Sequence, residues 1–341
     1  MRNFKKLVAL VVAIASLVFV LAGCGSSSSS STADNSSAAS SSAASTTADA
    51  KGNYKIAFIA KNTVDAFHAK INAAAKTSLD GLVKDGSIAE WKMYDGQTDP
   101  VTQVNLANDA INWGANLIII LPAEAAGSAP VLEKAKEKNI PVIVVNSKTE
   151  NTDQLAAAYI GSNDVQAGEM MAKFIQEKIP NGGGYGHIQG IIGNSAQIER
   201  GKGLHNILDK DAKWKLLPGA EQTGEWQAEK AVKFAEDWVA KNGTKLNAII
   251  CDNDDMSSAV QTAMNAKNRK DIIAIGVDGN KGPLTMVKNG ELQATIYQDG
   301  AAQVTKGVEL GLKVLKGEKV EKSTMIDFVL ITKDNVDKYL K

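Results

Sequence analysis

The chain has 341 residues, with 38 basic and 38 acidic side chains, so its formal net charge at pH 7 is zero. This balance argues against a nucleic-acid partner and against a charge-driven contact with a membrane surface. The length leaves room for one large or two medium-sized domains.

The N-terminal segment is typical of an export signal. Three basic residues among the first six precede an apolar run at 7–21, and the sequence Leu-Ala-Gly-Cys follows, ending at Cys24. A positive start, an apolar stretch and small residues at a cut site describe a signal peptide. The four-residue ending resembles the bacterial lipoprotein box, which implies a signal peptide at 1–23 and a lipid on Cys24. An uncleaved anchor is the alternative, but the run is shorter than the ~20 residues that span a bilayer.

The next segment is a linker in composition. Residues 25–50 are almost entirely Ser, Ala, Thr and Gly, which cannot bury apolar surface. We therefore expect a disordered tether at 24–51, with a reach of roughly 28 Å by flexible-chain scaling. Because Cys24 carries the lipid, the only other cysteine, Cys251, has no partner and no intrachain disulfide is expected.

Short apolar runs then alternate with segments of helical periodicity. The runs are rich in Ile and Val without polar alternation, as in parallel strands buried on both faces. This order predicts right-handed βαβ units and an α/β fold. Strands are expected at 56–60, 117–121, 142–145, 157–160, 188–192, 248–251, 272–277, 294–297 and 328–331. Helices are expected at 66–84, 130–138, 164–178, 227–241 and 256–266, and inter-domain crossings at 161–163 and 298–300.

Polar residues follow most of the runs. In open parallel sheets, ligands bind at the carboxyl ends of the strands, so these residues are the first candidates for a site. They come from both halves of the chain, which favours a cleft between two domains. The candidates are Lys61, Asp65, Asn146, Ser147, Asn194, Asn253, Asp254, Asp278 and Gln298.

With Arg200, Phe67 and Trp226, these side chains favour a neutral polyhydroxylated ligand. Carboxylates, amides and a guanidinium can each bind adjacent hydroxyl groups, and aromatic faces cover the C–H face of a sugar ring. A charged ligand would require an excess of one sign. Each residue also has a structural alternative, since an Asp after a strand is often a helix cap and a lone Trp is often part of the core.

The sequence indicates no enzyme, cofactor or metal centre. The three histidines, His68, His187 and His205, show no catalytic-triad spacing. The glycine-rich stretch 182–186 lacks the Gly-Lys-Ser/Thr of a phosphate-binding loop and is predicted to be a flexible surface loop. The acidic stretch 252–255 lacks the glycine and distal glutamate of a calcium loop, so ligand contact and helix capping are expected there.

From residue 54 onward the chain resembles a periplasmic sugar-binding protein family, the ribose- and galactose-binding proteins of bacterial ABC transporters. The matching segments keep their order and spacing over almost the whole body. They are 139–143 with Asn146, 161–164, 194–195 leading to 199–203, 253–256, 276–279, 294–296 with Gln298, and 314–318.

The resemblance implies a particular architecture. Two doubly wound parallel-sheet lobes would be joined by a three-segment hinge, the type I periplasmic-binding-protein fold. The N-terminal lobe would comprise 52–162 plus 299–326, and the C-terminal lobe 163–298 plus 327–341. Such lobes close on a sugar by a hinge motion.

It also implies roles in the second lobe and for the aromatics. Arg200, Asn253 and Asp278 match the family's hydroxyl-binding residues by position. Phe67 and Trp226 match the aromatics that stack on the sugar ring.

In the first lobe, Asp65 and Asn146 match contacts of the galactose type. Gln298 lies at a crossing and matches a ligand-contacting amide. Lys61 and His68 are additions in this chain, which either touch the ligand or line the rim.

The chain also departs from the family at points that bear on the sugar. Ser147 stands where the ribose type has an arginine, and Ala196 where the galactose type has a carboxylate near Arg200. The calcium loop of the galactose type has no counterpart here. The exact sugar is therefore left open.

The resulting expectation is a monomeric solute-binding lipoprotein on the outer face of the cell membrane. It would capture a monosaccharide, with a galactose- or glucose-like hexose favoured, and deliver it to an ABC permease. Alternatives are a cyclitol or other polyol as ligand, a sensory protein that feeds a receptor, and a carbohydrate enzyme. The enzyme would need two positioned carboxylates such as Asp65 and Asp278.

Overall fold

The structure is a computed structural model that describes residues 52–340. The expected signal peptide, the expected lipid attachment at Cys24 and the expected linker lie outside these residues. Within the described range, no helix combines the length and apolarity needed to cross a bilayer.

A six-stranded parallel sheet organises the first half of the described chain. Its order is β12-β5-β4-β3-β1-β2, so the last strand returns from near the C-terminus to pair with β5. The strands are β1 (Lys55–Ala60), β2 (Glu90–Asp95), β3 (Leu117–Ile120), β4 (Val142–Asn146), β5 (Ala158–Gly161) and β12 (Ser323–Met325). The helices are α1 (Ala66–Lys84), α2 (Pro100–Trp113), α3 (Ala129–Glu137), α4 (Thr152–Leu155) and α10 (Gly300–Leu315).

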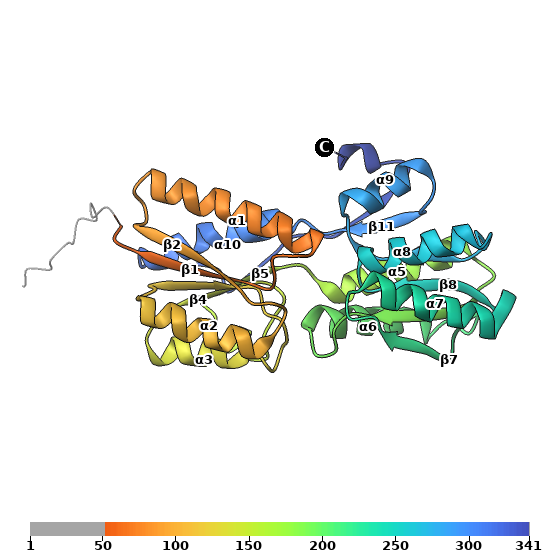
Figure 1. The fold of residues 1–341 in the computed structure, drawn as a ribbon, viewed down its shortest axis with the longest axis horizontal. Coiled ribbons are helices and arrows are strands. Elements are labelled where there is room, and N and C mark those ends of the chain that lie inside the picture. Colours follow the sequence, from red (N-terminus) through yellow and green to blue (C-terminus); the bar gives the residue numbers. More distant parts are fainter. Residues whose placement is uncertain (1–51, 341) are drawn as a thin grey trace, which may run out of the picture. The chain divides into compact units, whose positions relative to one another are not determined.

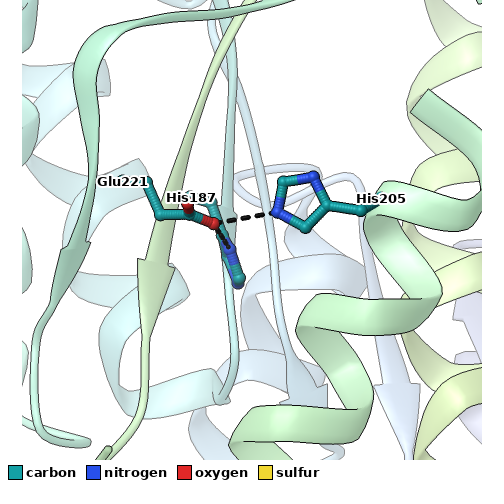
Figure 2. A group of neighbouring side chains, drawn as sticks. All are labelled: His187, His205 and Glu221. Carbon is teal, nitrogen blue, oxygen red and sulfur yellow. Dashed lines mark hydrogen bonds and ion pairs between the residues drawn. The ribbon is translucent and has the colours of Figure 1, made fainter. Parts of the chain in front are cut away.

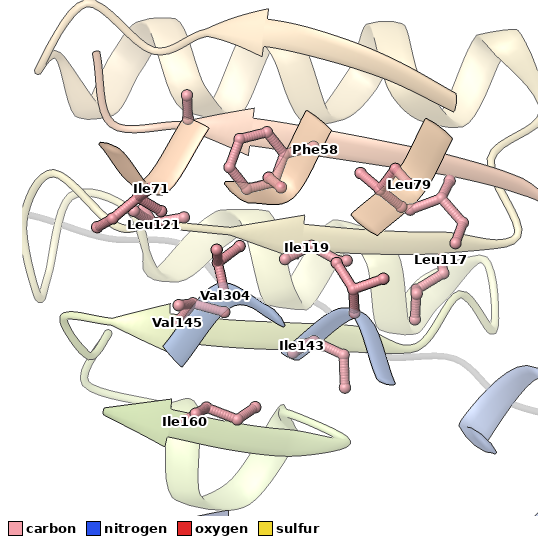
Figure 3. Packing of buried hydrophobic residues seen from close by; sticks show 14 of the residues in the cluster. Phe58, Ile71, Leu79, Leu117, Ile119, Leu121, Ile143, Val145, Ile160 and Val304 are labelled. Carbon is pink, nitrogen blue, oxygen red and sulfur yellow. The ribbon is translucent and has the colours of Figure 1, made fainter. Parts of the chain in front are cut away.

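This sheet is covered on both faces, which explains its continuous apolar strands. Alternate residues of β3 face opposite sides: Ile119 packs under α1 and α10, while Ile118 and Ile120 pack against α2 and α3 (Figures 1 and 3). Fully burying each such side chain stabilises the fold by about 1.5–3 kcal/mol. Phe58, on β1, lies in the same cluster as Ile119 (Figure 3).

The second half contains a four-stranded parallel sheet, ordered β7-β6-β8-β9, and a three-stranded sheet, ordered β10-β11-β13. Strand β13 runs antiparallel to β11, the one antiparallel pairing within the described residues. The strands are β6 (Gly183–Gln189), β7 (Trp214–Thr223), β8 (Leu246–Cys251), β9 (Ile273–Ile275), β10 (Val277–Asp278), β11 (Ala294–Tyr297) and β13 (Val329–Thr332). The helices are α5 (Asp164–Lys178), α6 (Ser195–Leu208), α7 (Ala228–Asn242), α8 (Asp254–Ala266) and α9 (Lys281–Asn289), with 3₁₀ turns η1 (Gly243–Lys245) and η2 (Val336–Lys338).

Helices again cover both faces of the four-stranded sheet. Apolar residues of α5 and α6 pack on one face, and those of α7 and α8 on the other (Figure 1). Helices α5 and α6 approach closely because Gly168 and Gly203 present no side chain: a Cβ on either would overlap backbone of the other helix. Cys251 is buried under α7 and α8, and burial raises the pKa of its thiol well above the usual value.

The α/β prediction is confirmed, and the predicted helices at 66–84 and 164–178 have the observed bounds. Strands β2, β7 and β12 were not predicted because they lie at sheet edges and carry polar residues. Helices α2, α4, α6, α9 and α10 were also missed.

The surface loop predicted at 182–186 is wrong. Strand β6 begins at Gly183, and Gly184, Tyr185 and Gly186 are buried. The glycines serve packing: a Cβ on Gly186 would overlap the ring of Trp238. A glycine run can therefore mark a strand that another side chain approaches closely.

Candidate functional site

The ten residues to which the sequence assigns ligand contact all line one cavity, whereas Asp254, a further candidate at a strand end, does not. These ten residues surround about 480 Å³ of unfilled space, part of which is open to solvent. They are Lys61, Asp65, Phe67, His68, Asn146, Arg200, Trp226, Asn253, Asp278 and Gln298. Ser147, Asn194, Ala196 and Asp255 complete the lining.

Most of the four additional lining residues also lie close to the carboxyl end of a parallel strand, where the sequence predicts ligand binding. Ser147 follows β4, and both it and Asn194 were among the polar residues noted at strand ends. Asp255 belongs to the acidic stretch after β8. Ala196 had been recognised only as a missing carboxylate. Residues one or two positions into a helix are therefore as informative as those directly after the strand.

Several lining residues also cap helices, so the structural and functional interpretations coexist. The Asp65 carboxylate accepts a 2.7 Å hydrogen bond from the His68 backbone N–H at the start of α1. Asn253 accepts one of 3.2 Å from Met256 at the start of α8. A residue that caps a helix at the end of a parallel strand is held at the edge where ligands bind.

Three lining residues have unusual backbone conformations. The φ angles are 70° at Asn146, 65° at Trp226 and 143° at Asp278. Residues with a Cβ rarely adopt positive φ, and such strain concentrates at functional sites where the surrounding structure enforces it. Asn146 is held by hydrogen bonds from its side-chain amide to Gln303, 3.0 Å, and from the Tyr159 hydroxyl to its carbonyl, 2.7 Å.

Asp65 and His68 form a close pair on one wall. The Nδ1 atom of His68 lies 2.7 Å from Asp65 Oδ2, which also accepts a 2.7 Å hydrogen bond from Asn62. Burial alone would raise the pKa of Asp65, but hydrogen bonds from His68 and Asn62 outweigh it and hold that pKa below its usual range. Burial lowers the pKa of His68 despite the opposing effect of Asp65, which favours the neutral imidazole.

Arg200 lies at the centre of a buried polar network. Its Nε donates to Asp164 at 2.8 Å, its Nη1 to the carbonyl of Asp252, and its Nη2 to Gln298 Oε1 at 3.4 Å. A guanidinium has five N–H groups, so two remain for a ligand. The network thus orients Arg200 and leaves it hydrogen-bonding capacity.

Lys61 is the second cation of the cavity. It is 5% exposed, and its ammonium lies 5.1 Å from the centroid of the Trp226 ring. Burial lowers the pKa of Lys61 to about 8, with Asp65 opposing the shift. The ammonium is therefore charged at neutral pH but easily deprotonated.

Three buried polar atoms of the lining have no partner among the described residues. They are Nε2 of His68, Nε1 of Trp226 and Nε2 of Gln298. A buried polar group without a hydrogen-bond partner costs about 1–3 kcal/mol. Such atoms in a cavity are therefore suited to form hydrogen bonds with the hydroxyl groups of a ligand.

The charges of the lining are close to balance. Lys61 and Arg200 face the carboxyl groups of Asp65, Asp255 and Asp278. Burial and the neighbouring Asp254 raise the pKa of Asp278 well above its usual value, which reduces its negative charge. The cavity therefore suits an uncharged ligand with many hydroxyl groups.

Comparison with known proteins identifies the family. The model of the periplasmic binding protein domain matches residues 56–319, so the chain belongs to that family. The resemblance inferred from the sequence motifs is confirmed, and the fold is the type I periplasmic-binding-protein fold.

Individual relatives agree with this assignment. The chain is 30% identical to a xylitol-binding protein of Mycolicibacterium smegmatis, over 77% of this chain and 74% of the relative. It is 31% identical to a ribose import binding protein of Haemophilus influenzae, over 75% and 86%. Among solved structures, an ABC transporter solute binding protein from Bacillus halodurans with bound myo-inositol matches with a TM-score of 0.79 and 25% identity, over 86% and 99% of the two chains.

Proposed function

We propose that this protein is the solute-binding component of an ABC importer and binds a neutral sugar or polyol in the cavity described above. The observation that carries the proposal is the combination of balanced charge with buried, unpartnered polar atoms and two aromatic rings in one cavity. Relatives named for ribose and xylitol binding support it. No catalytic step is part of the proposal.

Two classes of neutral ligand are candidates for this cavity. The first-lobe pair Asp65 and Asn146 favours a galactose- or glucose-like hexose, as expected from the sequence. Relatives named for xylitol and solved with myo-inositol support a polyol or cyclitol as the second candidate. Both classes offer adjacent hydroxyl groups to Arg200, Asn253 and Asp278.

In this proposal, two lobes close on the ligand and present it to the permease. The lobes comprise 52–162 plus 299–326 and 163–298 plus 327–341, and the protein acts as a monomer. A lipid on Cys24 holds it at the outer face of the cell membrane, which raises its effective concentration near the permease.

A ligand panel tests the function. The purified protein is screened by thermal shift with galactose, glucose, xylose, ribose, xylitol and myo-inositol, and the best ligands are measured by calorimetry. A ligand at 100 times its Kd should stabilise the fold by about 2.7 kcal/mol. A hexose preference supports the first candidate and a polyol preference the second. No shift with any member of a broad panel, or turnover of a sugar, would contradict the proposal.

Lipidation has its own test. Cells that express the protein are labelled with a palmitate analogue, and the Cys24→Ser variant serves as the control. We expect label on the native protein only, and release of the variant into the medium or periplasm. Equal labelling of both would contradict the lipid assignment.

A further inference from the structure

Away from the ligand cavity, two imidazoles and one carboxylate converge in the second half of the protein (Figure 2). The Nδ1 atom of His187 lies 2.9 Å from Glu221 Oε1, and Nε2 of His205 lies 3.0 Å from the same oxygen. The donor atoms of the three residues all lie within 4.8 Å of one another. None of the three lines the ligand cavity.

The fold holds this cluster on regular elements. His187 on β6 and Glu221 on β7 are direct partners in the parallel register of the two strands. His205 comes from α6, which packs over the same sheet. One turn earlier on α6, Gly201 lies beside the buried ring: a Cβ there would be 3.5 Å from Cε1 of His187, an ordinary van der Waals contact.

Each imidazole has a carboxylate on its other nitrogen. Nε2 of His187 lies 3.0 Å from Asp252, and Nδ1 of His205 lies 3.2 Å from Asp209. In protein metal sites, a ligating histidine usually donates its second ring N–H to such a group, which fixes the tautomer. Here the carboxylates would keep protons on Nε2 of His187 and Nδ1 of His205 and leave the two opposite nitrogens free to coordinate.

We propose that His187, His205 and Glu221 form a binding site for a divalent transition-metal ion of the zinc type. Two imidazoles and a carboxylate with an open fourth position are a known ligand set for Zn²⁺. Zn–N distances of about 2.0–2.1 Å place neighbouring ligands roughly 3.3 Å apart. The two imidazole–carboxylate spacings here are 2.9 and 3.0 Å, and the two imidazole nitrogens lie within 4.8 Å of each other. His187 is fully buried, whereas the His205 and Glu221 side chains are about one-third exposed, so the ion can enter from solvent.

The surrounding charge favours a cation. Three carboxylates, Asp209, Glu221 and Asp252, contact the two imidazoles. Calcium would need six to eight oxygen ligands, and Mg²⁺ also prefers oxygen, so neither suits two imidazoles.

Metal titration tests the proposal. The protein is prepared without a histidine tag, treated with a chelator and dialysed, then titrated with ZnCl₂ by calorimetry and thermal shift. We expect one ion per chain and a higher Tm, with no effect of Ca²⁺ or Mg²⁺. Co²⁺ should give the visible absorption of a four-coordinate ion.

Matched variants locate the ion. His205→Ala and Glu221→Gln should each weaken zinc binding at least tenfold, whereas Glu229→Gln, at an exposed carboxylate on α7, should bind as the native protein does. Circular dichroism checks that each variant is folded. Absence of one-to-one binding, or native affinity in both cluster variants, would overturn the site. Because the titration uses no sugar, its failure would leave the proposed function of the cavity untouched.

Discussion

Arg200 and Asp164 form a buried ion pair between α6 and α5, with Nε and Oδ1 2.8 Å apart and side-chain exposures of 5% and 3%. The pair connects a residue of the ligand cavity with the packing of α5 against α6. Arg200 lines the cavity, whereas Asp164 does not. Substitution of Arg200 should therefore affect both ligand binding and stability.

Arg200→Ala should lower ligand affinity by about 2–3 kcal/mol, because hydrogen bonds from a charged donor are lost. It should also lower the free energy of unfolding by about 3–5 kcal/mol, because the Asp164 carboxylate is left buried without its partner. Calorimetry and urea denaturation measure the two effects. The double variant with Asp164→Asn should regain part of the stability but none of the affinity. Recovery of affinity in the double variant would show that Arg200 acts only through the fold.

Trp226→Ala should weaken ligand binding by about 1–2 kcal/mol through loss of an aromatic face against the ligand. The measurement is calorimetry with the best ligand of the panel. Trp113→Ala is the matched control, since Trp113 lies at the end of α2 and does not line the cavity. Equal losses in the two variants would point to a general effect on the fold.

Lys61→Met should stabilise the ligand-free protein at pH 7 by about 3–4 kcal/mol, because each unit by which burial lowers a lysine pKa costs about 1.4 kcal/mol while the group is charged. The folded pKa is about 8 and the reference value 10.5. Between these values the unfolded chain holds a proton that the folded chain has lost, so native stability rises with pH there.

The gain from Lys61→Met should accordingly be full below pH 8 and shrink as the pH rises toward 10.5. Urea denaturation of both proteins at pH 7 and pH 10 gives the difference in their free energies of unfolding at each pH. The titration of other groups affects both proteins alike and cancels in this difference. A gain of the same size at both pH values would mean that the pKa of Lys61 is not lowered by burial.

Gly186→Ala should destabilise the protein by about 1–3 kcal/mol, because the new methyl group overlaps the Trp238 ring in a packed core. The control is Gly81→Ala in α1, where a Cβ meets nothing within 4 Å. That change should stabilise the helix by up to about 1 kcal/mol, since alanine is the better helix former. Thermal unfolding of both variants checks the pair, and a neutral Gly186→Ala would contradict the packing role of β6.

Six of the ten cavity residues could be selected from the sequence because parallel strands bring their carboxyl ends to one edge. The other four, Phe67, His68, Arg200 and Trp226, do not follow from that rule. Lys61, Asn253 and Asp278 each follow an apolar run, so their position needs only the local pattern. The edge strands β2 and β7 could not be recognised in the same way. Their exposed positions carry polar residues, which removes the continuous apolar signal.

The hydrogen-bond partners of Arg200 and His187 are far from them in the sequence, so their interactions could not be predicted from it. The hydrogen bond between Asp65 and His68 spans three residues and could be anticipated as a helix cap. Arg200, by contrast, reaches Asp164, Asp252 and Gln298, which lie far away along the chain. No periodicity relates such positions.

By itself, the sequence determined the export signal as an expectation, the α/β class, the family and the edge of the sheet where a ligand is expected. These depend on local runs, on spacing and on segments that keep their order. Only the tertiary structure decided that Glu221 meets His187 and His205, that Lys61 is buried against Trp226, and that a glycine-rich stretch is a strand. The physical reason is that burial, pKa and coordination depend on distances between side chains brought together by packing, and those distances are set by strand register and helix contact.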